Sequence, residues 1–508
     1  MLWGILNKQQ AVLILALGIS FWLVCRYRRL QHIPGPFFAK LTNLHRFILT
    51  KLGYIHLYQS EAHERYGPVV RFGPNMVSIC DPEAIQTVFH KRSGFVKSDM
   101  YRAFRPWTTN GLLLSVFTAE NDVANRQMKQ HIAIYFSLSY TALTFEKRVD
   151  NAINMLFEQL DRQFVATGAS CDLTRWFKFF SYDAMGLMTF SRAYGYIEHG
   201  EETTGIITDV KNTMLTIGPM TQIPWLDWLL HKNWLINRIK PEPVSCLLNY
   251  VLERIEERRK SPKEIHDTAT AGPDTRTDFL GYFLQAQDRK SNKVPPRFLS
   301  TWTLANILGG SDSTASMLRS VVCFLVEHPD ALKSVRTELR GKLQDTSGPS
   351  LIIPKWHELQ SLPFLDACIK ESLRLDPPFA TALERIVPAG GATICGHFFP
   401  GGSVVGMNPY ITNRYRPTWG EDADLWRPSR WLEGDTANVR KLEASLLSFG
   451  AGTRTCLGQN VAMFEIKKLV AALFINYDID LVKPRENTNR YSWIIMPSSV
   501  ESTIRRRS

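Results

Sequence analysis

The residues with the clearest capacity for chemistry surround Cys456. They form the run Phe449-Gly450-Ala451-Gly452-Thr453-Arg454-Thr455-Cys456-Leu457-Gly458. A lone cysteine usually packs as a small buried hydrophobe, so its neighbours carry the argument. Gly452 and Gly458 let the backbone turn tightly and approach a flat group, and the N–H groups of such a turn can stabilise a metal-bound thiolate. Arg454 offers a cation to a carboxylate, and Phe449 can shield the loop from water. The pattern predicts that Cys456 is the axial ligand of a haem iron; a buried structural cysteine in a Gly-rich turn is the alternative.

This run resembles the cysteine-ligand loop of the cytochrome P450 family, which reads F-x-x-G-x-R-x-C-x-G. The match is complete at the fixed positions of that loop. The resemblance implies a thiolate-ligated haem (heme) as cofactor, with Cys456 as the iron ligand and Arg454 at a haem propionate. It also gives Phe449, Gly452 and Gly458 the role of shaping the loop around the cofactor.

A second chemical feature interrupts an apolar helix predicted from Pro296 to about Glu327. The run Gly309-Gly310-Ser311-Asp312-Ser313-Thr314 consists largely of poor helix formers. Such a break can open a groove in which a small molecule lies against the backbone. The Asp312 carboxylate and the neighbouring hydroxyls would then relay protons to a bound ligand. A kink caused only by helix packing is the alternative.

The same run resembles the distal-helix motif of cytochromes P450, [AG]-G-x-[DE]-T-[TS]. The resemblance makes Asp312, Ser313 and Thr314 the catalytic residues and places Gly309 at the substrate pocket. Ser313 occupies the position of the family's oxygen-activating threonine. A serine keeps the hydroxyl but lacks the methyl group that restricts χ1. We therefore expect proton delivery with a less firmly held hydroxyl, from Ser313 or from Thr314.

Glu371 and Arg374 form an E-x-x-R pair one helical turn apart. Glu256 and Arg259 have the same spacing, and there we expect an exposed helix face. The later run from Trp426 to Trp431 resembles the family's F-x-P-x-R-[FW] segment, which implies that Arg430 completes a buried Glu-Arg-Arg cluster. Such a cluster fixes geometry more than it adds stability, so its expected role is structural.

Two further cations are candidates for the haem propionates. Arg385 resembles the arginine that follows the E-x-x-R helix in the family. The family's earlier [WH]-x-x-x-R pattern maps onto Asn125 and Lys129, where Lys129 keeps the charge but loses the bidentate fork of an arginine. A solvated helix face explains Lys129 about equally well.

The expected substrate pocket follows the E-x-x-R helix. Phe379 and Ala382 resemble the residues that start the pocket-lining strand in the family, and the aromatic-rich stretch 100–117 resembles the loop over the haem. Together they imply a mostly apolar small-molecule substrate. Core packing explains each aromatic residue singly as an alternative.

The N-terminal region predicts a membrane anchor. Residues 11–25 carry no charge, and three arginines follow within four residues, which favours a single-pass helix whose C-terminal side is cytosolic. We expect a lumenal end at 1–10, a transmembrane anchor at 11–27, a basic and Pro-rich hinge at 28–36 and a catalytic domain at 37–508. This arrangement resembles that of microsomal cytochromes P450 and predicts an endoplasmic reticulum membrane location. A buried core helix is the alternative.

Composition supports one large catalytic domain. The chain has 508 residues, 44% of them hydrophobic, and its eight cysteines show no pairing pattern, which argues against a disulfide framework or a zinc site. The net charge of +12 comes without a nucleic-acid-binding motif, so an acidic protein or an anionic membrane is the expected partner. Helical periods from 140 to 345 and strand-like runs near 65–80, 384–406 and 491–505 predict a mainly α fold with a smaller β region.

The resemblance implies a haem-thiolate monooxygenase, an oxidoreductase that oxidises an apolar small molecule with O2. Electrons would come from NADPH through NADPH-cytochrome P450 reductase, since the chain has no dinucleotide fingerprint. Lys467 and Lys468 are expected to help that partner dock. The general run of the sequence looks like fungal, pisatin-demethylase-like members that act in secondary metabolism. The alternatives are a haem-thiolate isomerase or dehydratase that needs no reductase, and a non-catalytic haem sensor.

Overall fold

The computed structural model describes residues 17–18, 24, 27–108, 111–239, 245–260, 278–289, 294–343, 351–483 and 490–507. Most of the predicted membrane anchor lies outside these ranges. Within them, no helix combines the length and apolar character that crossing a membrane requires. Residues 30–35 of the predicted hinge pack on the rest of the fold, where Leu30 and Ile33 are fully buried.

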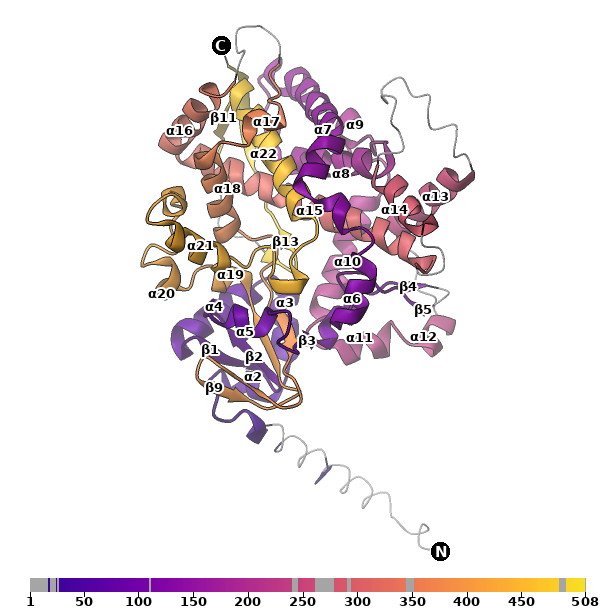
Figure 1. Ribbon diagram of the computed structural model, residues 1–508, viewed down its shortest axis with the longest axis vertical. Coiled ribbons are helices and arrows are strands. Elements are labelled where there is room, and N and C mark those ends of the chain that lie inside the picture. Colours follow the sequence, from indigo (N-terminus) through magenta and orange to yellow (C-terminus); the bar gives the residue numbers. More distant parts are fainter. Residues whose placement is uncertain are drawn as a thin grey trace, which may run out of the picture.

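The first half of the chain is mainly helical (Figure 1). Its helices are α2 (Phe37–Leu41), α3 (Leu44–Leu52), α4 (Ile55–Tyr66), α5 (Ala84–Phe89), α6 (Asp122–Lys129), α7 (Leu138–Leu160), α8 (Leu173–Phe190), α9 (Tyr196–His199), α10 (Ile206–Met220), α11 (Pro224–Leu230), α12 (Trp234–Ile239), α13 (Cys246–Lys260) and α14 (Phe279–Asp288). A short 3-10 helix, η1 (Asp99–Phe104), lies in the aromatic-rich stretch.

The second half begins with the longest helix of the described residues. The helices are α15 (Arg297–Glu327), α16 (Pro329–Arg340), α17 (Trp356–Leu359), α18 (Pro363–Leu375), α19 (Pro409–Thr412), α20 (Arg416–Trp419), α21 (Thr436–Ser445) and α22 (Gln459–Asn476). Side chains of α15 are buried on nearly every side, against α8, α14, α18 and α22. The predicted helix from 296 to 327 is therefore confirmed, and it is one continuous α-helix through Gly309 and Gly310.

The β region consists of small sheets, as predicted from the strand-like runs. The five-stranded sheet has the order β1 (Val69–Gly73), β2 (Met76–Ile79), β10 (Val404–Met407), β7 (Leu383–Ile386) and β3 (Val96–Lys97). Only the β2–β10 pair is parallel. A three-stranded sheet has the order β11 (Tyr477–Leu481), β14 (Glu501–Arg506) and β6 (Cys171–Asp172). Two-stranded pairs are β4 (Trp107–Thr108) with β5 (Gly111–Leu112), β8 (Ala392–Ile394) with β9 (His397–Phe399), and β12 (Arg490–Tyr491) with β13 (Ile495–Met496).

The helices and the sheets occupy different parts of the molecule. Figure 1 shows the five-stranded sheet at the lower end and the helices around α15 above it. The largest apolar cluster surrounds α15 and includes residues of α7, α8, α14, α18 and α22, whereas a separate cluster fills the five-stranded sheet. Both the Cys456 loop and the Gly309–Thr314 segment border the large cluster, which gives them a rigid support.

Candidate active site

The loop before α22 is held in one conformation by its glycines. Gly450 and Gly452 have φ angles of +69° and +64°, which residues with a Cβ atom rarely adopt. A Cβ on Gly452 would also lie 1.8 Å from the carbonyl oxygen of Phe89, at the end of α5. The N–H of Cys456 donates to the carbonyl oxygen of Phe449, 2.8 Å away, and closes the loop. Cys456 therefore stands at a fixed position just before the N-terminus of α22.

The Cys456 side chain is exposed. Many protein atoms nevertheless lie around the sulfur. Burial raises the pKa of this thiol, while the backbone N–H groups of Gly458 and Gln459 and the charge of Lys129 act in the opposite direction. These are the groups that would stabilise a thiolate once a cation binds to it.

Helix α15, which carries the segment Gly309–Thr314 and is called the distal helix below, has an open face at Gly309. Gly309 is exposed in the middle of an otherwise buried helix, and a Cβ there would meet no atom within 4 Å. The Ser313 hydroxyl lies one turn further on and donates to the Gly309 carbonyl oxygen at 2.7 Å. Thr314, by contrast, is buried, and its hydroxyl has no hydrogen-bond partner among the described residues. Ser313 rather than Thr314 thus belongs to the open face.

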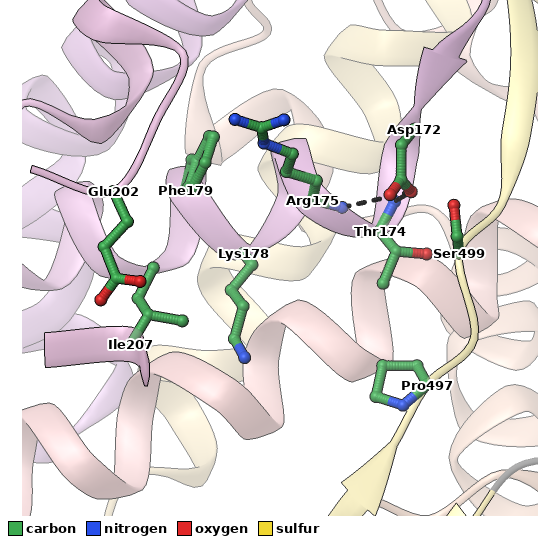
Figure 2. A pocket seen from close by; sticks show the side chains of 9 residues that line it. All are labelled: Asp172, Thr174, Arg175, Lys178, Phe179, Glu202, Ile207, Pro497 and Ser499. Carbon is green, nitrogen blue, oxygen red and sulfur yellow. Dashed lines mark hydrogen bonds between the residues drawn. The ribbon is translucent and has the colours of Figure 1, made fainter. Parts of the chain in front are cut away.

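Asp312 points to the neighbouring helix α8. Its Oδ1 lies 2.9 Å from Nζ of Lys178, and its Oδ2 accepts a hydrogen bond of 3.1 Å from the Tyr182 hydroxyl. Lys178 also lines a surface pocket of about 310 Å³ between the start of α8 and the segment 497–499. Figure 2 shows Lys178 and Arg175 leaving α8 in opposite directions. The ion pair therefore connects α15 to a surface pocket.

Three buried or half-buried cations gather beside the Cys456 loop. Arg454 hydrogen-bonds to Asp122 and to the carbonyl oxygens of residues 119 and 120. Arg385 is buried and donates to the Tyr101 hydroxyl at 3.1 Å. Lys97 is buried too, and burial together with the charges of Arg385 and Arg454 holds its pKa well below the ordinary value. In the part of the chain that the structure describes, neither Lys97 nor Arg385 is ion-paired with a carboxylate.

These cations and open faces fit a haem. Buried cations without a counter-ion are costly, and two propionate carboxylates would neutralise them. A Cβ at Gly309 or at Gly458 would meet no atom within 4 Å, so neither residue would obstruct a flat group that lies against it. Lys129 is half-buried, and the charge of Cys456 acts on its pKa, so it too lies near the sulfur.

The sequence pattern alone did not reveal Lys97. It lies in the two-residue strand β3, directly opposite Arg385 in β7. Only this long-range pairing brings the two cations together, and no local motif marks it. Asn125, which occupies the other position of the predicted propionate pattern, instead donates to the carbonyl oxygen of Val116 at 2.9 Å.

The predicted Glu-Arg-Arg cluster forms as expected. Glu371 accepts two hydrogen bonds from Arg374, of 2.8 and 2.9 Å, and one of 2.8 Å from Arg430. All three side chains are buried, and the indole N–H of Trp431 adds a fourth bond to Glu371. The cluster joins α18 to the segment 428–431. As also expected, Glu256 lies on an exposed face, where it pairs with Lys260.

Aromatic residues from three distant segments meet at one place. The ring of Trp493 lies 4.4 Å from Phe104, 5.3 Å from Phe117 and 4.8 Å from Phe379 (centroid distances). Trp493 has a φ of +127°, a strained conformation, and its buried indole N–H has no hydrogen-bond partner among the described residues. Ala382 does not join this group, because it packs among apolar residues of the five-stranded sheet.

Lys467 and Lys468 are not surface residues, so the prediction that they dock a partner is wrong. Lys467 is buried and pairs with Asp366 at 2.7 Å. Lys468 is fully buried between Glu146 and Asp150 of α7, at 2.7 and 2.6 Å. Both lysines fasten α22 to its neighbours.

The geometry agrees with what comparisons with known proteins find. The family model for cytochrome P450 matches residues 33–502. The chain is 41% identical to a cytochrome P450 monooxygenase of Aspergillus flavus over 498 residues, which are 97% of this chain and 96% of the relative. It is 41% identical to the cytochrome P450 monooxygenase mfmA of Annulohypoxylon moriforme (97% and 95%) and 39% identical to the monooxygenase pkfB of Emericella nidulans (97% of each chain).

Proposed function

Because this chain belongs to the cytochrome P450 family and is a haem-thiolate monooxygenase, we propose that Cys456 is its iron ligand. The observation that carries the assignment is the position of the thiol. The side chain is exposed, the backbone N–H groups of Gly458 and Gln459 are hydrogen-bond donors to the sulfur, and buried cations lie beside the loop. Among the other described cysteines, Cys80, Cys171, Cys323 and Cys368 are buried, and Cys246 is the first residue of α13, far along the chain from the Gly-rich loop.

Different residues bind different parts of the cofactor. Lys97, Arg385 and Arg454 hold the propionates, and Arg454 also ties the loop to the start of α6 through Asp122. Gly309 and Gly458 keep the two faces clear of side chains. Once bound, the thiolate-ligated haem supplies the activation of O2.

Asp312 and Ser313 supply protons on the distal side. The Ser313 hydroxyl lies on the open face, and Asp312 precedes it in the chain. Asp312 is joined through Lys178 to a surface pocket, so protons can enter from solvent without crossing the substrate region. Thr314 takes no part, since its buried hydroxyl has no hydrogen-bond partner in the described chain.

The substrate is an apolar, ring-containing small molecule with one oxygen acceptor. Phe104, Phe117, Phe379 and Trp493 offer aromatic surface, and Phe117 is 37% exposed despite its place in the interior. The unpaired indole N–H of Trp493 would find its partner in a carbonyl or hydroxyl oxygen of the substrate. Such a molecule suits fungal secondary metabolism, the setting that we infer from the fungal relatives.

The electron donor is an acidic reductase that docks on the side of the Cys456 loop. Exposed cations border this side: Lys91 and Arg92 follow α5, whose last residue contacts Gly452, and Arg126 lies one turn before Lys129. NADPH-cytochrome P450 reductase is the partner that we propose. Charge attraction would guide its approach and weaken with salt.

A membrane surface is the second proposed partner. Large apolar side chains are exposed on two neighbouring parts of the fold, namely Phe37, Phe38, Leu44 and Ile48 on α2 and α3, and Trp225, Trp228 and Trp234 on α11 and α12. Helix α3 packs on α10, which leads into α11, so the two parts are close (Figure 1). Exposed tryptophans suit a membrane interface. We propose that this face rests on the endoplasmic reticulum membrane.

Oxygen consumption tests the proposed function. The full-length haem protein in vesicles, with reductase, NADPH and candidate ring compounds chosen by their optical binding spectra, should consume O2 and form a product one oxygen atom heavier. Omission of NADPH should stop both. Product formation without NADPH or reductase would instead establish an isomerase or dehydratase.

A further inference from the structure

Four tyrosine rings form a continuous chain from the distal helix to α13. Tyr182 on α8 lies 6.0 Å from Tyr196 and 6.2 Å from Tyr194, measured between ring centroids. Tyr194 and Tyr196 stack at 5.4 Å, and Tyr194 lies 5.0 Å from Tyr250 on α13. Each ring is thus in contact with the next, at the spacing of packed aromatic pairs.

The inner end of the chain meets the proton-delivery residues. The Tyr182 hydroxyl donates to Oδ2 of Asp312, which directly precedes Ser313 on the open face of α15. A phenol is oxidised more readily when a base takes its proton at the same time. Asp312 is such a base, so Tyr182 is the ring best placed to lose an electron toward the haem site.

The middle of the chain carries a buried carboxyl group, that of Asp183, whose pKa is raised by burial while backbone N–H donors act in the opposite direction. Asp183 is fully buried and accepts N–H bonds from Tyr194, Gly195 and Ile197, at 2.8, 3.0 and 2.8 Å. Burial raises the pKa of Tyr194, Tyr196 and Tyr250, and the Asp183 charge adds to the rise at each of them, so this carboxylate lies near all three rings. In a poorly screened interior, an anion stabilises positive charge on a neighbouring ring.

The outer end reaches the surface of α13. Tyr250 is only partly buried, unlike the other three rings, and its ring lies under the guanidinium of Arg254 at 5.1 Å. Tyr194 has a further property, because its buried hydroxyl has no hydrogen-bond partner among the described residues. Packing alone would be served better by phenylalanine there, since an unpaired buried hydroxyl costs free energy.

We propose that Tyr182, Tyr196, Tyr194 and Tyr250 form an electron-transfer chain that returns electrons to an over-oxidised haem site when no substrate consumes the oxidising equivalents. This role rests on the proposed haem-thiolate function and adds a protective activity to it. Tyr182 gives an electron to the haem site and its proton to Asp312. Electrons then move inward ring by ring, Tyr182 recovers its proton, and Tyr250 loses one electron to the chain and one proton to solvent.

A soluble thiol completes the balance at the surface. A thiol gives a hydrogen atom to the Tyr250 radical, and two such events join two thiols as a disulfide. With hydrogen peroxide as oxidant, one peroxide and two thiols therefore yield two waters and one disulfide.

The test follows the radical rather than the monooxygenase reaction. Full-length ferric haem protein without substrate is treated with hydrogen peroxide and a nitroso spin trap, and the trapped residue is identified by mass spectrometry of peptides. We expect an adduct on Tyr250 in the wild type. Tyr194→Phe removes no hydrogen bond seen among the described residues, yet it should abolish this adduct and speed the peroxide bleaching of the haem.

Tyr282→Phe is the matched control. Tyr282 stacks on Tyr135, with ring centroids 4.6 Å apart, in a separate group of tyrosines. The Tyr282→Phe substitution should therefore leave both the Tyr250 adduct and the bleaching rate as in the wild type. An unchanged Tyr250 adduct in Tyr194→Phe, or equal losses in both variants, would overturn the chain. The reduced carbon monoxide spectrum of the same samples separates this failure from a failure of the thiolate assignment.

Discussion

The carboxylate of Asp312 on α15 is bound to the ammonium group of Lys178 on α8, with Oδ1 and Nζ 2.9 Å apart. The pair couples the largely buried helix α15 to a pocket at the protein surface. The Ser313 hydroxyl, on the next residue, donates to the carbonyl oxygen of Gly309. Proton delivery should therefore depend on a residue outside the distal motif.

Replacing Lys178 tests this dependence. Lys178→Met should slow proton delivery about tenfold, a smaller loss than removal of a general acid itself. More of the NADPH consumed should then appear as hydrogen peroxide, and the solvent isotope effect on turnover should change. Arg175→Met is the control, since Arg175 lines the same pocket but bonds to the Gly200 carbonyl oxygen. Equal coupling in both variants would contradict the role of Lys178.

The two neighbouring hydroxyls of the distal helix should behave oppositely. Ser313→Ala should lower product formation about tenfold or more and raise peroxide release, because it removes the hydroxyl on the open face. Thr314→Val should leave the coupling unchanged and stabilise the protein by about 1 kcal/mol, because the lost hydroxyl is buried and unpaired in the described structure. Product and peroxide yields per NADPH measure the first effect, and thermal unfolding measures the second. A loss of coupling in Thr314→Val alone would reverse the assignment.

Alanine substitutions at two glycines of the cysteine loop should have different effects, one on protein stability and the other on haem binding. Gly452→Ala forces a Cβ against the Phe89 carbonyl oxygen in a left-handed conformation, so it should destabilise the protein even without haem, by about 3 kcal/mol or more. Gly458→Ala meets no protein atom within 4 Å. It should leave the unfolding of the haem-free protein unchanged and reduce haem incorporation. Normal haem content in Gly458→Ala would show that the cofactor does not approach this residue.

The Glu371 cluster should make stability depend on acid pH. Burial raises the pKa of Glu371, but the hydrogen bonds and charge of Arg374 and the charge of Arg430 outweigh it, so the pKa lies below its ordinary value. A carboxyl group with a lowered pKa stabilises the fold above its unfolded pKa of about 4.3, and this contribution is lost as the pH falls through the folded value.

Glu371→Gln should remove this contribution and cost about 3–5 kcal/mol at neutral pH, since two arginines stay buried without their partner. The unfolding midpoint, followed by circular dichroism from pH 7 to 3, measures both effects. Glu256→Gln, which has the same spacing to Arg259 on an exposed face, should behave like the wild type. A similar loss of stability in both variants would show that the buried cluster contributes no more to stability than the exposed pair.

Motifs that resemble those of the family predicted part of the site, including one contact between residues 59 positions apart, Glu371 and Arg430. The E-x-x-R pair and Arg430 form the expected cluster, and the helix from 297 to 327 has nearly the predicted bounds. Ser313 and Thr314 could not be told apart by sequence, because their roles depend on which side of the helix faces open space.

Long-range contacts account for what sequence could not predict. Lys97 joins the cations only because β3 pairs with β7, and Trp493 reaches Phe104 and Phe117 only through tertiary packing. Lys468 has the residue type of a docking surface, yet the acidic residues of α7, more than 300 positions earlier in the chain, bury and neutralise it.

The reduced carbon monoxide spectrum tests the central claim most directly. Thiolate-bound haem gives a band at about 450 nm, because the sulfur donates electron density to the iron. The wild-type protein should show this band, and Cys456→Ala should lose it, while Cys246→Ala, which removes another exposed cysteine, should keep it. A band that survives unchanged in Cys456→Ala would show that another residue binds the iron.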